Sequence, residues 1–575
     1  MFMPKIKPVF KIALFSGVAM SVIMTPSHTY AQVEQATGIA DPARIGQELL
    51  NIDELPELSA EVKIEKTVLQ NAPEGAENIT FALDNLEIDG VSAYGAENLN
   101  PFYADMLGDV VSLADIYGLA NTLTQKYRND GYILTQVIVP PQTIENGTVQ
   151  LRVIEGHVDQ IIIEGEEGSA TDIIRRYASN LKENNILNAQ KLERYLLLIN
   201  DLPGVSARSV LSPSATKTGA SDLTIIVERD KYEAEVSLDN HGSRFLGPYQ
   251  ASFSNSLNSV LGFNERISAQ FVISGDKNRT DELLFGSLLY EQPINQYGTK
   301  VRFLGSITST EPGFTLDQFD VEGQSHFLSA TVTHPFIRSR TTNIFGRASF
   351  DLRRVDSKND LEPTRKDRIR SVRVGATAQF IDTFMGVGVN AIDFEVSQGV
   401  DIFGSSQNGA TSLTRAAGDP NYTKAELQLQ RLQRLTSQLN LLVAGQGQWA
   451  SSALLSSEEF GVGGTDIGRG YDSSEIVGED GIAGKVELQW NEPHAIKYVD
   501  DYQLYSFFDA GRVWNQDATT SAGKRESISS TGIGIRADLT EHTQAAFSVA
   551  FPLTRRIDTT NDRDPRYYVS MTHKF

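Results

Sequence analysis

Residues 344–353 read IFGRASFDLR, and the side chains along this stretch alternate in character. One set is Ile344, Gly346, Ala348, Phe350 and Leu352, and the other is Phe345, Arg347, Ser349, Asp351 and Arg353. Because successive side chains of a β-strand point to opposite sides, the pattern predicts a strand with one apolar face and one mostly polar face. A strand with lipid on one side and water on the other requires this division.

The same alternation continues through residues 231–575, for example in 439–449 (LNLLVAGQGQW) and 567–575 (YYVSMTHKF). We count about sixteen candidate strands, near the 9–11 residues that cross a bilayer at a tilt. Short connections (292–297, 335–342) alternate with long polar ones (356–367, 398–421, 460–481). The pattern predicts a mostly β protein with a C-terminal 16-stranded antiparallel transmembrane β-barrel, and it disfavours a soluble β-sandwich or propeller. Phe575 ends the chain at a lipid-facing position, which indicates a role in barrel assembly.

The N-terminal segment has the three-part pattern of a secretory signal. Three lysines precede an apolar run at 12–24, and a small residue at Ala31 marks the expected cleavage site, so 1–31 is interpreted as a signal peptide. A membrane anchor is disfavoured because the apolar run is short for a helical span. Residues 32–77 are interpreted as a helix and a linker, with the helix at 41–51, Asp41 as its N-cap and Pro42 at its first position.

Two consecutive segments, 78–156 and 157–230, each predict the order β-α-α-β-β. In the first, apolar residues recur at helical spacing between Ser112, which is the expected N-cap, and Gly131. Two strands are expected after this helix, at 132–139 and 148–155. In the second, Thr171 is the expected cap of the first helix. Each segment must bury its helices against a small sheet, so we expect two small α+β domains before the barrel.

Composition narrows the range of functions. The chain has 575 residues, a net charge of −22, 8 histidines and no cysteine. Disulfides, thiolate metal sites and cysteine nucleophiles are therefore excluded, and the histidine spacing suggests no zinc site. The acidic balance argues against nucleic acid as a partner. No nucleophile–base set or nucleotide-binding motif is found, so we expect no enzyme activity, no cofactor and no metal.

Four stretches carry a family resemblance: 132–156 (YILTQVIVPPQTIENGTVQLRVIEG), 461–464 (GVGG), 468–471 (GRGY) and 507–514 (FFDAGRVW). Together with the layout, they resemble the haemolysin-activator (ShlB/FhaC/HecB) family. These proteins are the outer-membrane transporters of two-partner secretion (TpsB proteins), related to BamA. The resemblance implies that 78–156 and 157–230 are POTRA domains in the periplasm, and that the helix at 41–51 plugs the pore.

The resemblance also implies a function. POTRA domains would bind the N-terminal secretion domain of an unfolded partner exoprotein, which would then pass through the barrel of the outer membrane. An extended segment can add to a sheet edge through main-chain hydrogen bonds. Further expected partners are outer-membrane lipid, periplasmic chaperones and the barrel assembly machinery. A BamA-like assembly factor is the main alternative, but two POTRA domains favour secretion. A passive porin would need no such domains.

In the family, a long loop enters the barrel and its arginine pairs with an acidic residue of the wall. The matching residues here are Arg469, in a segment continued by Gly470 and Tyr471, and Asp509. Asp509 has the parity of the lumen, because Phe508 and Ala510 share the opposite face. A guanidinium can hold a carboxylate through two parallel hydrogen bonds. The alternative is an exposed loop arginine and a strand-end aspartate that never meet. Gly468 departs from the family, which often has an apolar residue there.

Overall fold

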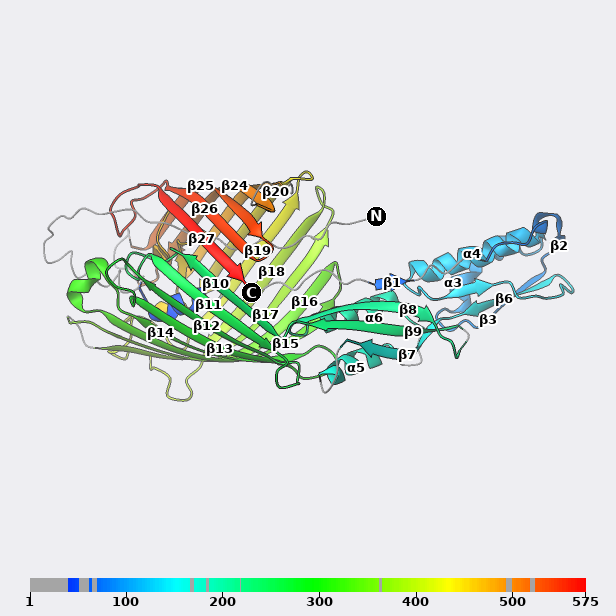
Figure 1. Ribbon diagram of the computed structural model, residues 1–575, viewed down its shortest axis with the longest axis horizontal. Helices are drawn as coiled ribbons and strands as arrows, with labels where there is room; N and C mark the ends of the chain where they lie inside the picture. Colours follow the sequence, from blue (N-terminus) through cyan, green and yellow to red (C-terminus); the bar gives the residue numbers. More distant parts are fainter. Residues whose placement is uncertain are drawn as a thin grey trace.

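A computed structural model of the chain shows a β-barrel with two small α+β domains extending from one end (Figure 1). It describes residues 40–50, 62–64, 70–165, 170–182, 186–217, 219–360, 364–492, 499–517 and 523–575. The predicted signal peptide, 1–31, lies outside the described residues, as does most of the predicted linker. Among the described helices, none is long and apolar enough to cross a membrane.

Sixteen strands form the closed barrel, as predicted. Neighbours along the chain pair antiparallel, and the last strand pairs with the first. The strands are β10 (Tyr232–Asp239), β11 (Tyr249–Asn258), β12 (Arg266–Gly275), β13 (Leu283–Pro293), β14 (Lys300–Thr310), β15 (Glu322–Arg338), β16 (Thr342–Lys358), β17 (Arg365–Asp382), β18 (Gly388–Gly399), β19 (Thr423–Arg434), β20 (Leu439–Ala450), β23 (Asp480–Glu492), β24 (Asp501–Trp514), β25 (Arg525–Thr540), β26 (Thr543–Pro552) and β27 (Arg566–Lys574). Short turns connect the strands at the end of the barrel next to the two domains, which we call the domain end (Figure 1). Long connections lie at the opposite end, which we call the loop end.

The wall shows the alternation that the sequence predicts. On β16, Asp351 and Arg353 are buried toward the interior, and Ala348 on the other face is exposed. The expected strand length near 9–11 residues is wrong for β15, β16 and β17, which have 17, 17 and 18 residues, and for β23, β24 and β25, which have 13, 14 and 16. Their extra residues continue the ladder beyond the apolar band, because paired neighbours satisfy their backbone groups there too.

The seam between β10 and β27 is short. Only five residue pairs join these strands, from Glu235–Lys574 to Asp239–Ser570, whereas β10 and β11 share eight. Phe575 extends the seam through its backbone N–H, which donates to the carbonyl of Ala234 at 2.9 Å. Its side chain is 74% exposed and lies against His573, with ring centroids 4.6 Å apart.

The first α+β domain has a three-stranded sheet, a two-stranded pair and one long helix. Its elements are η1 (Ala76–Asn78), β2 (Thr80–Ala82), β3 (Asn85–Asp89), α3 (Ala96–Leu99), η2 (Asn100–Phe102), η3 (Ala104–Met106), β4 (Val110–Ser112), α4 (Leu113–Asn129), β5 (Gln136–Ile138) and β6 (Thr148–Ile154). The sheet order is β3-β6-β5, and β2 pairs with β4. Ser112 caps α4 in a capping box with Asp115, as predicted for Ser112. Hydrogen bonds from Ser112 hold the pKa of Asp115 below its usual range. Gly131 has a φ of +96° after the helix, also as predicted.

The first domain departs from the predicted β-α-α-β-β order, because three short strands, β2, β3 and β4, precede its one long helix. The predicted strand 132–139 is observed only at Gln136–Ile138, because Tyr132 to Thr135 form a turn. Ile133 and Leu134 of that turn pack against the core of the second domain. Their apolar pattern therefore reflects a contact between domains, which alternation within a strand does not reveal.

The second domain contains β7 (His157–Glu164), α5 (Thr171–Ser179), α6 (Ala189–Asn200), β8 (Val205–Pro213) and β9 (Ala220–Arg229). Its sheet order is β1-β8-β9-β7, where β1 (Val62–Ile64) comes from the segment before the first domain. The prediction that Thr171 caps α5 is wrong. Thr171 is the first helical residue, and Ala170 takes the cap position without a side-chain bond. The Asn264 amide of the barrel donates to the Ala170 carbonyl, so a tertiary contact fixes this helix start.

Charged groups join the second domain to the barrel. The guanidinium of Arg338 at the end of β15 donates to both carboxylate oxygens of Asp201, at 2.7 and 2.8 Å. Lys300 of β14 donates to the Asp201 carbonyl at 2.9 Å, and Arg194 of α6 donates to the carbonyls of Pro335 and Phe336. Bidentate pairing fixes orientation as well as distance, so the second domain is firmly attached to the barrel.

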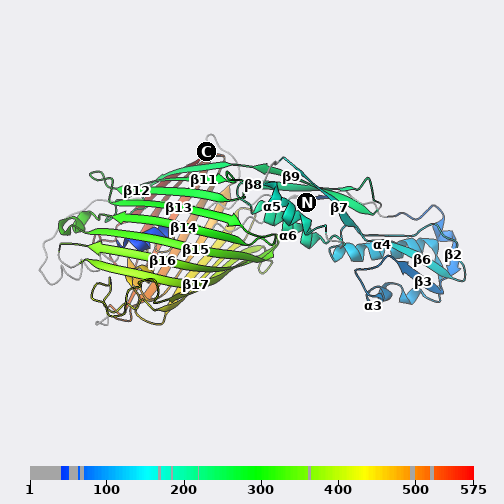
Figure 2. The same cartoon turned by 90° about the horizontal axis from the view of Figure 1, so that it is seen from below.

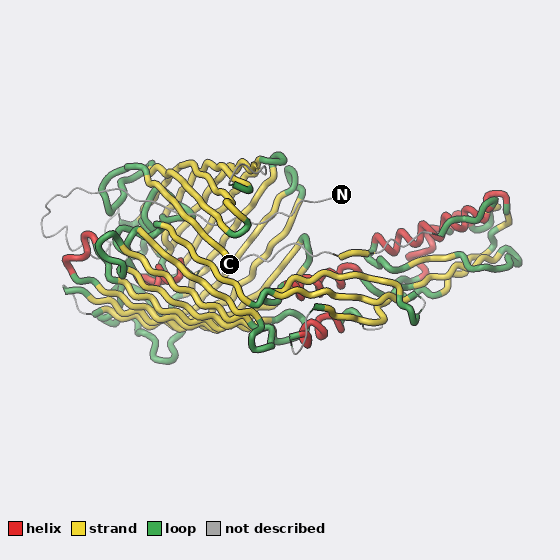
Figure 3. Tube along the Cα trace, in the orientation of Figure 1, coloured by secondary structure: helices red, strands yellow, loops and turns green. Residues whose placement is uncertain are grey.

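Helix α2 (Pro42–Leu49) lies inside the barrel, against β14 and β15 (Figures 2 and 3). Asp41 caps it by accepting hydrogen bonds from the N–H groups of Ala43 and Arg44, as the sequence predicts. Gly46 faces β14 so closely that an added Cβ would lie 2.6 Å from Thr308 Oγ1. The helix therefore fits the wall only because position 46 has no side chain.

Candidate functional site

The long connection between β20 and β23 folds back into the barrel. It contains η5 (Ser456–Glu458) and a small strand pair, β21 (Phe460–Val462) with β22 (Ile476–Gly478). Its apolar side chains form a buried cluster with residues of the wall and of the β26–β27 connection: Val462, Ile467, Tyr471 and Ile476 with Ala483, Val513, Ile528 and Ile557. The loop is thus a packed part of the interior.

Arg469 lies at the centre of this loop and is 2% exposed. Its Nε and Nη2 donate to the two carboxylate oxygens of Asp509, at 3.0 and 2.8 Å. The backbone N–H groups of Gly468 and Arg469 donate to the same carboxylate, at 3.2 and 3.1 Å. The structure therefore brings Arg469 and Asp509 together in the bidentate geometry that the motif suggests.

Asp509 is fully buried and points into the barrel, whereas Phe508 beside it is 49% exposed on the outer face. This matches the parity expected from the sequence. A buried carboxylate needs several donors to offset the loss of hydration. Asp509 has the four donors of the loop and, at 3.4 Å, the hydroxyl of Ser530.

Three further residues complete the site, and sequence reasoning missed them. Glu487 accepts from Arg469 Nη1 at 2.6 Å and from Arg536 at 2.8 Å. The ring of Phe507 lies under the Arg469 guanidinium, 3.5 Å from its centroid, as a cation–π contact. The Tyr568 hydroxyl donates to the Arg469 carbonyl. One signal was available: Phe507 is an aromatic residue on the same, interior-facing side of β24 as Asp509.

The residues around Arg469 fix the loop tip against the wall. Gly468 has a φ of +96°, where a side chain would be strained, which explains glycine at this departure from the family pattern. A Cβ on Gly470 would lie 2.8 Å from the backbone nitrogen of Pro552. The hydroxyl of buried Tyr471 accepts from the backbone N–H groups of Thr554 and Arg555, both at 3.2 Å. All three predicted loop residues, 469–471, therefore contact the wall or its connections.

Helix α2 rests on the same loop. Arg44 Nη2 donates to the Ser456 carbonyl at 2.5 Å and to the Glu459 carboxylate at 3.1 Å. At the other end of the helix, Glu48 accepts from the hydroxyls of Ser473 and Ser474. On the wall side, Arg353 donates to the Ala43 carbonyl at 3.2 Å. Helix and loop together occupy the interior of the barrel.

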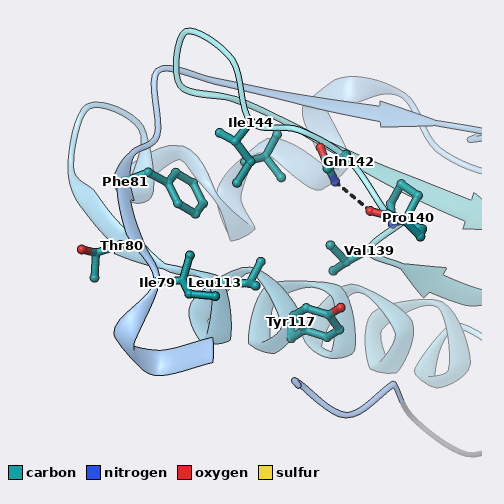
Figure 4. Close-up of a pocket in the computed structure, with 11 residues that line it drawn as sticks. Ile79, Thr80, Phe81, Leu113, Tyr117, Val139, Pro140, Gln142 and Ile144 are labelled. Carbon is teal, nitrogen blue, oxygen red and sulfur yellow. Dashed lines mark hydrogen bonds between the residues drawn. The ribbon is translucent and has the colours of Figure 1, made fainter. Parts of the chain in front are cut away.

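A second candidate site is a groove of about 440 Å³ on the first α+β domain (Figure 4). It lies between strand β2, the start of α4 and the 139–144 segment. The lining is mostly apolar: Ile79, Phe81, Leu113, Tyr117, Val139, Pro140, Pro141, Ile144 and Val149, with Thr80 and Gln142. Just beyond the β2–β4 pair, the Ile79 carbonyl accepts from the Leu113 N–H and the Leu83 N–H donates to the Asp109 carbonyl. Because hydrogen-bonded positions alternate along an antiparallel pair, Thr80 next to Ile79 directs its backbone groups away from β4.

Comparisons with known proteins agree on one family. The family described as haemolysin secretion/activation protein ShlB/FhaC/HecB matches residues 219–537, and the ShlB-type POTRA domain matches residues 81–156. The heme/hemopexin transporter protein HuxB of Haemophilus influenzae (strain 86-028NP) is 24% identical over 479 residues, 82% of each protein. The outer membrane transporter CdiB of Dickeya dadantii is 21% identical over 576 residues, 96% of each protein.

Solved structures show the same fold. CdiB from Escherichia coli matches with a TM-score of 0.72 at 18% identity, over 97% of this chain and all of that one. BamA from Haemophilus ducreyi lacking POTRA domains 1–3 matches with a TM-score of 0.51 at 13% identity, over 86% of this chain and all of that one. The chain therefore belongs to the ShlB/FhaC/HecB family of TpsB outer-membrane transporters, with its barrel in the outer membrane and its POTRA domains in the periplasm.

Proposed function

We propose that this protein captures an unfolded partner exoprotein in the periplasm through its POTRA domains and exports it through the barrel. The groove on the first POTRA domain is the observation that carries the proposal. An extended chain placed there could pair with Thr80 through its main chain and place alternate side chains on the apolar lining.

The filled interior of the barrel fits a transporter whose pore is closed when no cargo is passing. Helix α2 and the 451–479 loop occupy the interior together, so an exported chain needs at least one of them to move. The second POTRA domain, bound to the barrel through Arg338 and Asp201, would keep the capture surface in line with the entrance. We propose that the chain carries out this transport without enzyme activity of its own. Outer-membrane lipid, periplasmic chaperones and the barrel assembly machinery stay predicted partners.

The alternative is a BamA-like assembly factor. The short β10–β27 seam favours it, because a ladder of five residue pairs is easier to open than its neighbours. Co-expression with a neighbouring exoprotein separates the two functions. Export predicts that cargo is lost from the medium and cell surface when this protein is deleted, with other barrels at normal levels. Loss of several unrelated barrels would instead support an assembly factor.

The capture step is tested by Ile79→Asp, with Val110→Asp as a matched control. Both side chains are exposed apolar residues of the first POTRA domain, 53% and 73% exposed, but only Ile79 lines the groove. We expect Ile79→Asp to reduce secreted cargo per folded barrel by about tenfold, the effect of losing roughly 1.4 kcal/mol of binding. Deleting residues 78–156 should abolish secretion and leave the barrel inserted. Equal secretion by both aspartate variants would contradict capture at the groove.

A further inference from the structure

The outer face of strands β15–β17 changes from apolar to basic near the loop end. Leu328, Leu352 and Val372 are exposed or half-exposed and end the apolar band. The next outward residues are His326, Arg354 and Arg370, followed on β17 by Arg368 and Lys366. The cross-strand register places Leu352 opposite Arg370, so the change occurs at one level of the wall.

Within the described residues, this basic rim, defined as Arg354, Lys366, Arg368 and Arg370, is only partly neutralised, because Asp356 on β16 lies opposite Lys366. Arg354 lies directly opposite Arg368, and like charges in that position destabilise a sheet. Asp356 pairs with Arg354 at 2.5 Å. Within the described ranges, no carboxylate forms an ion pair with Lys366, Arg368 or Arg370. Such an arrangement indicates an anionic partner outside the chain, although the protein as a whole is acidic, with a net charge of −22.

Arg370 is held in place before any ligand binds. Its Nη1 donates to the carbonyls of Arg353 and Ile369, at 3.0 and 2.8 Å, and its Nη2 lies 3.4 Å from the Phe403 carbonyl. Its Nε is buried and has no hydrogen-bond partner among the described residues. A guanidinium fixed in this way keeps its charge at the edge of the apolar band, which reduces the ordering cost of binding.

An aromatic residue lies beside the basic rim on the outer side of the wall. Phe403, from the connection between β18 and β19, is 76% exposed, and its ring centroid lies 6.1 Å from that of Phe350 on the outer face of β16. Its backbone φ of +49° belongs to a tight turn that directs the chain back toward the wall. Cationic groups next to an exposed aromatic side chain fit a phosphorylated headgroup joined to acyl chains.

Strands β11, β12, β14 and β20 lack this chemistry at the same level. The outward residues nearest the loop end are Tyr249 on β11, Gly275 on β12, Ser309 on β14 and Trp449 on β20. Arg512 on β24 is an outward arginine, in register with exposed Ile482. Its direct cross-strand neighbours, Ile482 on β23 and Ser527 on β25, are uncharged, and Arg525 on β25 lies diagonal to it, so it serves as a control with fewer cations around it. Four outward cations on β16 and β17, against two on β24 and β25, distinguish the basic rim from a general basic belt.

We infer that the basic rim and Phe403 form a binding site for a bis-phosphorylated, multiply acylated glycolipid of the outer leaflet. Arg368, Arg370 and Lys366 would contact its phosphates, with Arg368 donating paired N–H groups and Arg370 the remaining N–H of its Nη2. Phe403 and the apolar band below would contact its acyl chains. Because β15–β17 are the longest strands, such a lipid would support the side of the barrel that extends furthest beyond the apolar band.

The test uses the full-length protein in detergent, with lipid adducts measured by native mass spectrometry. The probes are bis-phosphorylated lipid A, its dephosphorylated form and phosphatidylglycerol. The variant Lys366→Gln/Arg368→Gln leaves the anchored Arg370 unchanged, and Arg512→Gln is the control. We expect the wild type and the control to retain lipid A preferentially, and the double variant to bind it about tenfold or more weakly. Phe403→Ser should weaken binding to a smaller extent.

Heat-modifiable migration on gels will show that each variant is a folded barrel. The inference is overturned if folded Lys366→Gln/Arg368→Gln retains lipid A as the wild type does. It is also overturned if phosphatidylglycerol or dephosphorylated lipid A is retained equally well, because the surface would then be a general anionic or apolar contact. Retention that depends on phosphate and on the basic rim supports the assigned site.

Discussion

The 451–479 loop and helix α2 both occupy the interior of the barrel, but they are held in different ways. Arg469 of the loop makes three side-chain hydrogen bonds to two buried carboxylates and a cation–π contact with Phe507. In α2, Arg44 uses Nη2 for two bonds, and its buried Nε and Nη1 have no partner among the described residues. An unpaired buried donor costs about 1–3 kcal/mol.

This difference separates a fixed element from a movable one. The loop is joined to the wall at both ends by β20 and β23, and its central charges are fully paired. The helix is flanked on both sides by residues outside the described ranges, and it contacts the loop through serine hydroxyls and a single arginine. We therefore expect α2 to leave the interior during transport more readily than the loop.

The largest effect is expected from breaking the loop's central pair. Arg469→Ala leaves Asp509 as a buried carboxylate without its main partner and removes one of the two arginines bound to Glu487. Loss of one member of a buried pair typically costs about 3–5 kcal/mol. Asp509→Ala likewise leaves the buried Arg469 guanidinium without its main carboxylate partner. Each variant should reduce secreted cargo per folded barrel by more than about tenfold. The measurement is cargo in the medium, normalised to heat-modifiable barrel in the outer membrane.

Two further variants test whether Arg469 and Asp509 act as one unit. The double alanine variant should secrete no less than the weaker single variant, because both changes remove the same interaction. Arg469→Lys should restore only part of the activity, since an ammonium cannot occupy both carboxylate oxygens in parallel. Clearly additive losses in the double variant would show that the two residues act separately.

Weakening the contacts of α2 should affect secretion less and should mainly change the ion conductance of the barrel. Gly46→Val adds a side chain at a position where even a Cβ alone would lie 2.6 Å from Thr308 Oγ1. Arg44→Ala removes the contacts with Ser456 and Glu459. Both variants should raise the time-averaged ion conductance of the purified barrel several-fold, because a few tenths to about 1 kcal/mol shifts the helix toward its displaced state. Secretion should change by less than about threefold.

Planar bilayer recordings will measure this conductance. If Arg469→Ala opens the channel while Gly46→Val and Arg44→Ala leave it closed, the roles of the fixed and movable elements are reversed. Such a result would show that the loop moves more readily than the helix, and it would not affect the description of the fold.

The smallest effect on transport is expected from removing Phe575. The residue lies outside the interior and extends the five-pair seam through one backbone bond to Ala234. Its loss should lower the amount of folded barrel in the outer membrane, by roughly twofold or more, because the last strand must pair with the first. Secretion per folded barrel should stay near the wild-type value. An undiminished amount of folded barrel would contradict the predicted role in assembly.

The barrel could be predicted from sequence because lipid and water impose opposite demands on neighbouring side chains. The alternation in 344–353 and 567–575 therefore indicated strands, and the number of strands followed from repetition. Strand length was less predictable, since β15–β17 continue beyond the apolar band. The α5 start was mispredicted because Asn264, 93 positions beyond Thr171, helps to fix it.

The candidate site was partly predictable, because the alternation along a strand also shows which side chains face the interior. Arg469 and Asp509 lie in short motifs, and the parity of Asp509 could be read from Phe508 and Ala510. Glu487 and Tyr568 lie on other strands, and many interior-facing polar residues share their pattern. Nothing in local sequence shows which of them meets Arg469. The position of α2 was likewise implied only by resemblance, because its sequence is compatible with packing on many surfaces.

Strand β1 has a consequence for the range of α2. Val62–Ile64 pairs with Ser209–Leu211 of the second POTRA domain, so the chain after the helix is tied to a fixed sheet. Eleven residues, 51–61, separate this strand from the end of the helical segment at Leu50. Fully extended, they reach roughly 40 Å. A helix released from the barrel therefore stays tethered to the second POTRA domain. Its effective concentration at the barrel is on the order of millimolar, so it can return when the cargo has passed.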